Sequence, residues 1–130
     1  MSIGLAYSSG GQTYNVVFRE FTGAGIPRQY ESVAAFSRTA AGTTSFSGSS
    51  ARQKYIWAIS SFVTPAKAQE LDSMFRKWDE DRAAGFSSGC GLTDETFGSP
   101  LTTTVVFTTP PSYIYLSPSL IQVDFGVTEV

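Results

Sequence analysis

The stretch from Tyr55 to Trp78 constrains the fold of this chain more than any other segment. It begins as an apolar run rich in β-forming residues, stops at Thr64 and Pro65, and continues with the spacing of an amphipathic helix. Thr64 is a favourable N-cap, and Pro65 suits the first helical turn, because its missing N–H would have no partner there. The pattern predicts a helix over residues 65–83. Its apolar face consists of Ala68, Leu71, Met74, Phe75 and Trp78.

The helix is predicted to pack on a sheet through Leu71, Phe75 and Trp78. We predict strands over residues 14–21, 53–63, 102–109, 113–116 and 121–127. The strand at 53–63 is apolar on both faces, which predicts a central strand covered on both sides. Residues 85–100 hold four glycines and are expected to be irregular. The sequence therefore predicts a single domain over residues 1–130, mainly β with one α-helix (α+β), as a β-sandwich or split barrel flanked by that helix.

Proline and small residues mark the breaks in this pattern. Pro110 and Pro111 are predicted to separate two strands, since proline cannot donate to a ladder. Residues 32–37 are a weak apolar run that fits helix or strand. Residues 38–50 are almost entirely Thr, Ala, Gly and Ser, with Phe46 in their midst. Such a segment buries too little apolar surface to offset its ordering entropy, so we expect it to be mobile in an isolated monomer.

The composition limits the classes of partner. Charged residues make up 15% of the chain, against about 25% in an average soluble domain. Either part of the surface is covered by another chain, or Ser, Thr and Gly solubilise a small domain. The net charge of -2 and the lack of a basic stripe argue against binding to duplex phosphate. No segment reads as a signal peptide or a membrane span, and the chain is expected to originate in the cytoplasm without inserting into a membrane.

Few residues offer catalytic chemistry. The chain has no histidine, which removes the common nucleophilic triads and the commonest transition-metal ligand. Its one cysteine, Cys90, is expected to be a small buried residue. The carboxylates at 79–81 would splay around a helix and face solvent, and Asp94 and Glu95 lack the spacing of a calcium loop. We therefore expect no catalytic, cofactor-binding or metal-binding residues, and an enzyme is the weakest hypothesis.

Several aromatic residues could form a recognition surface. Tyr113 and Tyr115 would share one strand face, and Tyr30 and Phe36 lie in the first third of the chain. Aromatic rows on sheets bind sugars or single strands, but they more often build a core or a subunit interface. The interface hypothesis is favoured here, with a sugar-binding β-sandwich module in receptor recognition as the alternative.

Three segments carry a resemblance to a known family. The strand end Ile-Ser-Ser-Phe-Val-Thr-Pro at 59–65 leads into the helix with its apolar residues at 68, 71, 75 and 78. The chain closes with Ile121, Val123, Phe125 and Val127 in alternation, followed by Glu129 and Val130. This layout, over residues 52–130, is similar to tail-tip proteins of long-tailed phages, namely the lambda-type minor tail protein M and the N-terminal domain of distal tail proteins.

The resemblance implies a tail-tube-like fold and a structural role without enzymatic activity. Members of this family stack as rings, commonly hexameric, that join the tail tube to the tip and surround the channel through which DNA passes. The partners of this chain would be copies of itself and neighbouring tail proteins. Its location would be the virion, after assembly in the host cytoplasm. Residues 38–50 would become ordered on an adjacent subunit with Phe46 as anchor. A tail tube or tail terminator subunit is the alternative within this class. The interface candidates are Tyr30, Thr43, Thr44, Phe46, Tyr113 and Tyr115.

Overall fold

A computed structural model of the chain describes residues 2–23, 28–30, 35–38, 42, 44–47, 54–85 and 89–130, and for 35–38 and 44–47 it describes the backbone. Within these residues the protein is mainly β with one helix, as predicted. The strands are β1 Ile3–Ser9, β2 Gln12–Phe18, β3 Glu20–Phe21, β4 Arg28–Tyr30, β5 Ala35–Arg38, β6 Thr44–Ser47, β7 Tyr55–Val63, β8 Cys90–Asp94, β9 Leu101–Ser117 and β10 Leu120–Glu129. The helix, α1, is Pro65–Ala83.

Eight strands form one antiparallel sheet that almost closes on itself. Its order is β2-β1-β8-β9-β10-β7-β3, and β4 also pairs with β7. The first and last strands of this path, β2 and β3, are consecutive in the chain, with Arg19 alone between them. One continuous segment therefore pairs with β1 by its first part and with β7 by its last. The sheet is a split barrel, one of the two predicted architectures.

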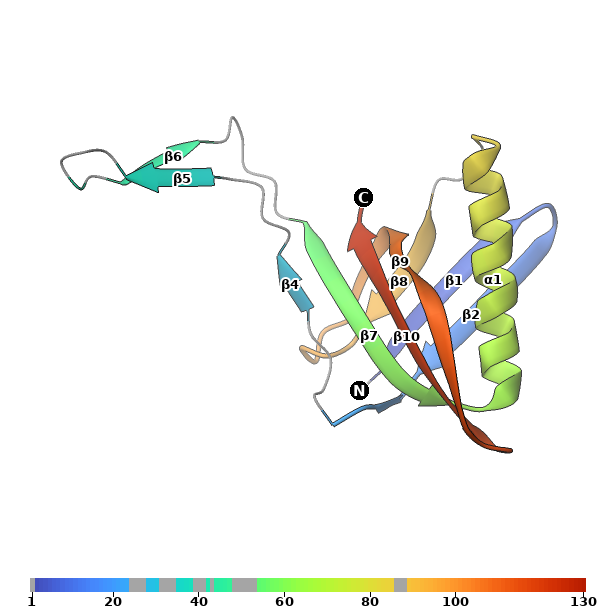
Figure 1. Cartoon of the computed structure of the whole chain (residues 1–130). Coiled ribbons are helices and arrows are strands. Elements are labelled where there is room, and N and C mark those ends of the chain that lie inside the picture. Colours follow the sequence, from blue (N-terminus) through green and yellow to red (C-terminus); the bar gives the residue numbers. More distant parts are fainter. Residues whose placement is uncertain are drawn as a thin grey trace.

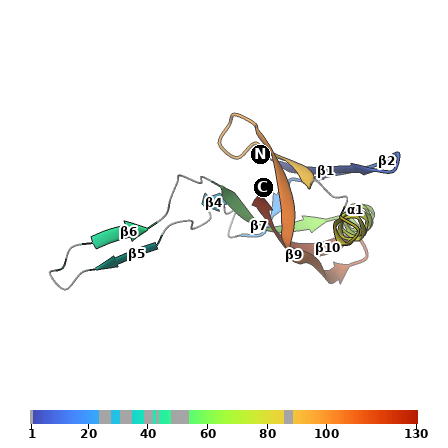
Figure 2. The same ribbon diagram turned by 90° about the horizontal axis from the view of Figure 1, so that it is seen from above.

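The helix covers the open side of the barrel. α1 packs against β2, β9 and β10, and Figure 2 shows it end-on between the β1–β2 side and the β10 side. The predicted N-cap is confirmed, since Thr64 Oγ1 accepts from the Lys67 N–H at 3.4 Å and Pro65 opens the helix. Gly85 follows the C-terminus with a φ of 81°, a conformation that glycine adopts without steric cost.

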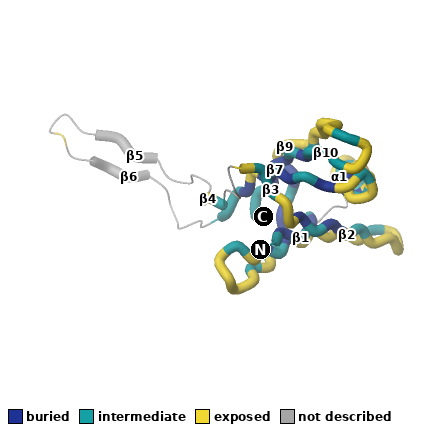
Figure 3. The backbone as a smooth tube through the Cα atoms, turned by 90° about the horizontal axis from the view of Figure 1, so that it is seen from below, coloured by how far each residue is buried: buried dark blue, intermediate teal, exposed yellow. Residues whose placement is uncertain are grey.

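The core lies between the inner face of the sheet and the helix (Figure 3). Along β10, the alternation predicted from the sequence is confirmed, because Val123, Phe125 and Val127 are buried. β7 is central, with β10 on one side and β3 and β4 on the other. The prediction that both of its faces are covered is wrong. Trp57 points into the core, whereas Ala58 is exposed, because a barrel has a single interior.

Four strands, β1, β4, β6 and β8, escaped the sequence prediction. β1 forms a hairpin with β2 through a tight turn at Gly10 and Gly11, both with positive φ. β8 lies within residues 85–100, which were expected to be irregular, and it joins β1 to β9. Its glycine-rich composition hid it, since Gly91 interrupts the run of β-forming residues.

The prediction of a break at Pro110 and Pro111 is also wrong, because β9 runs through both prolines. Asp124 of β10 pairs with Ser112, whereas Gly126 pairs with Thr109, so the two prolines lie in a bulge. A bulge is one of the few places in a sheet where proline is tolerated, since the missing N–H is not needed for the ladder. The result is one long strand in place of two short ones.

The weakly patterned stretch after β4 contains a second, two-stranded sheet. β5 pairs with β6 so that Phe36 lies opposite Phe46. The apolar run at 32–37 therefore contributes a strand, and the expectation that 38–50 is wholly loop is wrong at Thr44–Ser47. Within the described residues, this hairpin pairs with no strand of the barrel, as Figure 1 shows. We call it the arm.

Candidate functional site

The barrel leaves one long strand edge open. β9 pairs with β8 only from Leu101 to Val105, whereas its pairing with β10 continues to Ser117. From residue 106 to 117, β9 therefore has a ladder partner on one side only, within the described part of the chain. An unpaired edge offers alternate backbone N–H and C=O groups to another chain.

The other candidate edges are covered. The free side of β2 faces α1, where the Asn15 N–H donates to Glu70 Oε1 at 3.3 Å and Lys67 Nζ donates to the carbonyl of Val17 at 3.1 Å. The outer side of β7 is paired with β3 and β4. Helix side chains and short strands thus protect these edges, while the distal part of β9 remains accessible.

The open edge ends in an exposed apolar segment, residues 113–116, which we call the knob. Tyr113, Ile114, Tyr115 and Leu116 are 37%, 49%, 69% and 47% exposed. Tyr113 and Tyr115 share a strand face, as predicted, since they pair with Val123 and Ile121. The Tyr113 hydroxyl lies 3.5 Å from Asp72 Oδ1 of α1. Burial, with the Asp72 charge added to it, raises the pKa of Tyr113, so the phenol stays protonated.

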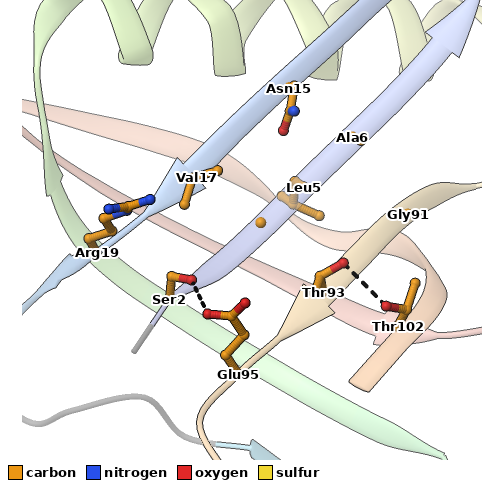
Figure 4. Close-up of a pocket in the computed structure, with 11 residues that line it drawn as sticks. Ser2, Leu5, Ala6, Asn15, Val17, Arg19, Gly91, Thr93, Glu95 and Thr102 are labelled. Carbon is orange, nitrogen blue, oxygen red and sulfur yellow. Dashed lines mark hydrogen bonds between the residues drawn. The ribbon is translucent and has the colours of Figure 1, made fainter. Parts of the chain in front are cut away.

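A second feature lies on the outer face of β1, β2 and β8, where a hollow of about 470 Å³ opens to solvent (Figure 4). Gly4, Ala6 and Gly91 form its floor, so the sheet backbone is nearly bare there. Its rim is polar. The remaining lining residues are Ser2, Leu5, Asn15, Val17, Arg19, Thr93, Glu95 and Thr102. One rim contact is fixed, because Ser2 Oγ donates to Glu95 Oε2 at 2.9 Å.

A buried ion pair fixes the base of the arm. Arg28 Nη1 of β4 lies 3.0 Å from Asp94 Oδ2 at the end of β8, with side-chain exposures of 5% and 0%. The same carboxylate oxygen accepts from Trp57 Nε1 at 3.0 Å, and Oδ1 accepts from the Thr96 N–H at 2.8 Å. Burial alone would raise the pKa of Asp94, but these hydrogen bonds and the Arg28 charge outweigh it and hold the pKa below its usual range.

Aromatic rings enclose this arginine. The Arg28 guanidinium lies 3.4 Å from the centroid of Phe97 and 4.8 Å from that of Tyr55. Tyr55 stacks on Tyr30 with centroids 4.6 Å apart, and their hydroxyls are 3.1 Å apart. Tyr30, predicted as an interface residue, is 59% exposed and stands where the chain leaves the barrel toward the arm. Its exposed face is open to a neighbour.

The predicted interface residues that the structure describes fall in three places, of which β4 with Tyr30 is the first. Tyr113 and Tyr115 lie in the knob, and Thr44 and Phe46 lie in β6 of the arm. Thr43 lies outside the described residues. The arm and the knob belong to different sheets, so sequence reasoning grouped residues that the fold does not pair.

The predicted packing residues of α1 are confirmed. Leu71 and Trp78 are buried, and the partly buried Phe75 packs edge-on against Phe107 with centroids 5.2 Å apart. Trp78 lies at the same 5.2 Å centroid distance from Phe107. This aromatic cluster packs the helix on β9 at Phe107, so α1 covers the first residues of the segment 106–117, and the exposed part begins at Thr108.

The described residues contain no cluster of three or more Asp, Glu, Cys or His side chains that could hold a metal ion. Cys90 is fully buried, and burial raises its thiol pKa to about 12.

Asp81 differs from the prediction of a solvated run at 79–81. Hydrogen bonds from Ser9 and Tyr7 lower its pKa, the latter at 2.5 Å. No described helix combines the length and apolarity needed to cross a membrane.

Sequence reasoning missed Arg28, Asp94 and the hollow. Asp94 follows an alternating Cys-Gly-Leu-Thr run and precedes a polar turn. Its position at the end of a strand is the sequence feature that could have indicated a buried carboxylate.

Neither family models nor curated proteins match the chain. What the protein does is therefore inferred from this geometry and from the resemblance of residues 52–130.

Proposed function

We propose that this protein is a non-enzymatic structural virion protein that assembles with itself into a ring at the tip of a phage tail. In this role it joins the tail tube to the tip and surrounds the channel that DNA crosses. The ring is hexameric, as is common in the resembled family. Its partners are further copies of the chain and the neighbouring tail proteins, and assembly takes place in the host cytoplasm.

The open edge of β9 is the observation that carries this proposal. The barrel covers its other edges with α1, β3 and β4 but leaves residues 106–117 unpaired. Natural proteins blunt such edges with charges, prolines or bulges. No charged residue occurs between Glu95 and Asp124, but Pro110 and Pro111 with their bulge interrupt the edge, so the stretch without any of these devices is residues 112–117. An uncharged, partly apolar edge suits permanent pairing with a neighbouring subunit, because obligate interfaces are poor in charge at their centres.

The arm and the exposed Tyr30 supply a second contact surface, distinct from the edge of β9. A head-to-tail contact between two different surfaces generates a ring when the rotation closes. The edge of β9 and the arm are two such surfaces. Residues 38–50, with Phe46 as the anchor, would then pack on the next subunit or ring.

The test is to measure the mass of the purified protein by light scattering and to image the same sample by negative stain. The expected result is an annular particle with a central hole. A charge on the open edge, Ile114→Lys, should abolish it, whereas Ser73→Lys on the exposed face of α1 should not. If the Ile114→Lys protein still forms unchanged rings, the β9 edge does not take part in the contact between subunits.

A sugar-binding module is the second candidate, favoured by the 69% exposure of Tyr115 beside Tyr113 on one strand face. Aromatic rings exposed in a row can stack on sugar rings. This alternative predicts a monomer that binds glycans on an array and loses binding on Tyr115→Ser. A ring-forming protein without glycan binding would exclude it.

A further inference from the structure

The knob is the longest run of exposed large apolar side chains in the described part of the chain. Four of the seven such side chains are consecutive, from Tyr113 to Leu116. Contiguous apolar surface of this kind marks an interaction site more often than isolated exposed residues do. The knob therefore offers a partner exposed apolar side chains on both faces of the strand, Tyr113 and Tyr115 on one and Ile114 and Leu116 on the other.

Two glycines in the hollow have no explanation among the described residues. Gly4 and Gly91 lie in strand interiors, where glycine weakens a sheet. Neither has a positive φ, and an added Cβ would meet only ordinary contacts, 3.8 Å from Val17 Cγ2 at Gly4 and 3.8 Å from the Ala6 carbonyl at Gly91. Glycine in a strand that neither backbone nor packing requires often marks a place where a ligand or another backbone approaches closely.

We propose that the knob of one copy docks in the hollow of the next copy. This inference rests on the proposed function and adds to it a contact between neighbouring copies, in which the end of the open β9 edge meets the hollow, beside the contact made by the arm. Figures 2 and 3 show β1 and β2 on one side of the barrel and the end of β9 and β10 on the opposite side. A knob and a hollow on opposite walls form a heterologous contact, which repeats from copy to copy until the ring closes.

The chemistry of the two surfaces agrees with this occupant. The knob is uncharged, and the floor of the hollow is Gly4, Ala6 and Gly91. The two charged lining residues, Arg19 and Glu95, carry opposite signs. The polar rim, with Asn15, Thr93 and Thr102, offers partners for a tyrosine hydroxyl, which needs one when its ring is buried.

The expected area also favours a repeated contact. Tyr113 and Tyr115 are 37% and 69% exposed, so of the roughly 150–250 Å² that one buried tyrosine covers they can add on the order of 200 Å² together, about a quarter of the ~800 Å² that each partner buries in a standard interface. The adjacent open edge of β9 supplies more. One such contact is then weak, and closure of the ring makes the assembly stable.

The test uses one variant on each surface. Gly91→Thr fills the hollow with the residue type of Thr93 and Thr102, and the ordinary φ and 3.8 Å clearance predict a monomer at least as stable as the wild type. Tyr115→Ser removes the most exposed ring of the knob. Each variant alone should weaken self-association at least tenfold. The matched control is Gly23→Thr, since Gly23 is exposed and has no neighbour within 4 Å of an added Cβ.

The decisive experiment is a mixture of Gly91→Thr and Tyr115→Ser proteins. The first keeps its knob and the second keeps its hollow, so the mixture should form a one-to-one dimer that extends no further, seen by native mass spectrometry. Rings of Gly91→Thr protein as stable as wild type would overturn the knob–hollow contact and leave the ring proposal standing. A wild type that remains monomeric at its highest soluble concentration would overturn both.

Discussion

Replacing the buried carboxylate of Asp94 by an amide should be among the most damaging conservative changes in this protein. Asp94 is fully buried and accepts from Arg28, Trp57 and the Thr96 N–H at 2.8–3.0 Å. In Asp94→Asn, the amide NH₂ can point at a donor instead of accepting from it, and Arg28 loses its counter-charge while only 5% of its side chain is exposed.

The magnitude follows from the burial of both partners. Removing one partner of a buried pair typically costs about 3–5 kcal/mol, because a charge is left without compensation. That is a large share of the roughly 5–15 kcal/mol by which a domain is stable. The matched control is Asp79→Asn, which breaks an exposed ion pair with Arg82 at 2.7 Å and should cost at most about 1 kcal/mol.

Urea unfolding of both variants measures these free energies, and pH dependence gives an independent check. The folded-state pKa of Asp94 is lowered, so its contribution is fully present above the unfolded pKa of about 3.9 and is lost as pH falls through the folded value. The gap between wild type and Asp94→Asn should therefore stay constant at neutral pH and narrow below about pH 4. A loss for Asp94→Asn no larger than that for Asp79→Asn would refute the reasoning.

Three further predictions concern the helix, the thiol and the arm. Trp78→Ala should lower the free energy of unfolding by about 3–5 kcal/mol in the same urea assay, because Trp78 is only 4% exposed and its ring packs on Phe107. A loss under about 1 kcal/mol would contradict this packing. Cys90 should resist Ellman's reagent in the native protein and react on unfolding, since it is fully buried with a pKa raised to about 12. Rapid native labelling would mean that β8 opens. Protease should cut within residues 38–50 faster in the free subunit than in the assembly, and equal rates would remove these residues from the interface.

The parts of the fold that follow from local chemistry were predictable. Thr64 and Pro65 mark the helix start through capping and backbone restriction, which need no knowledge of distant residues. The alternation along β10 revealed its buried face because one side of the strand meets the core. Both signals are local, and both predictions were confirmed.

The missed features depend on residues far apart in the sequence. Pro110 and Pro111 read as a break because the bulge that accommodates them is defined by pairing with β10. The hollow exists because Gly4 and Gly91 come from strands 87 positions apart, and Arg28 meets Asp94 across 66 positions. No periodicity within a short window carries that information. The sequence did identify Tyr113 and Tyr115 as a pair on one face, since that relation is local to one strand.

The measurement that tests the central claim most directly is the stoichiometry of the wild-type assembly, by native mass spectrometry with negative-stain imaging of the same sample. A ring-forming tail-tip subunit should give a closed particle with a central hole and six times the 14.0 kDa mass of one chain. A single 14.0 kDa species at every concentration, with no annular particles on the grid, would contradict the account.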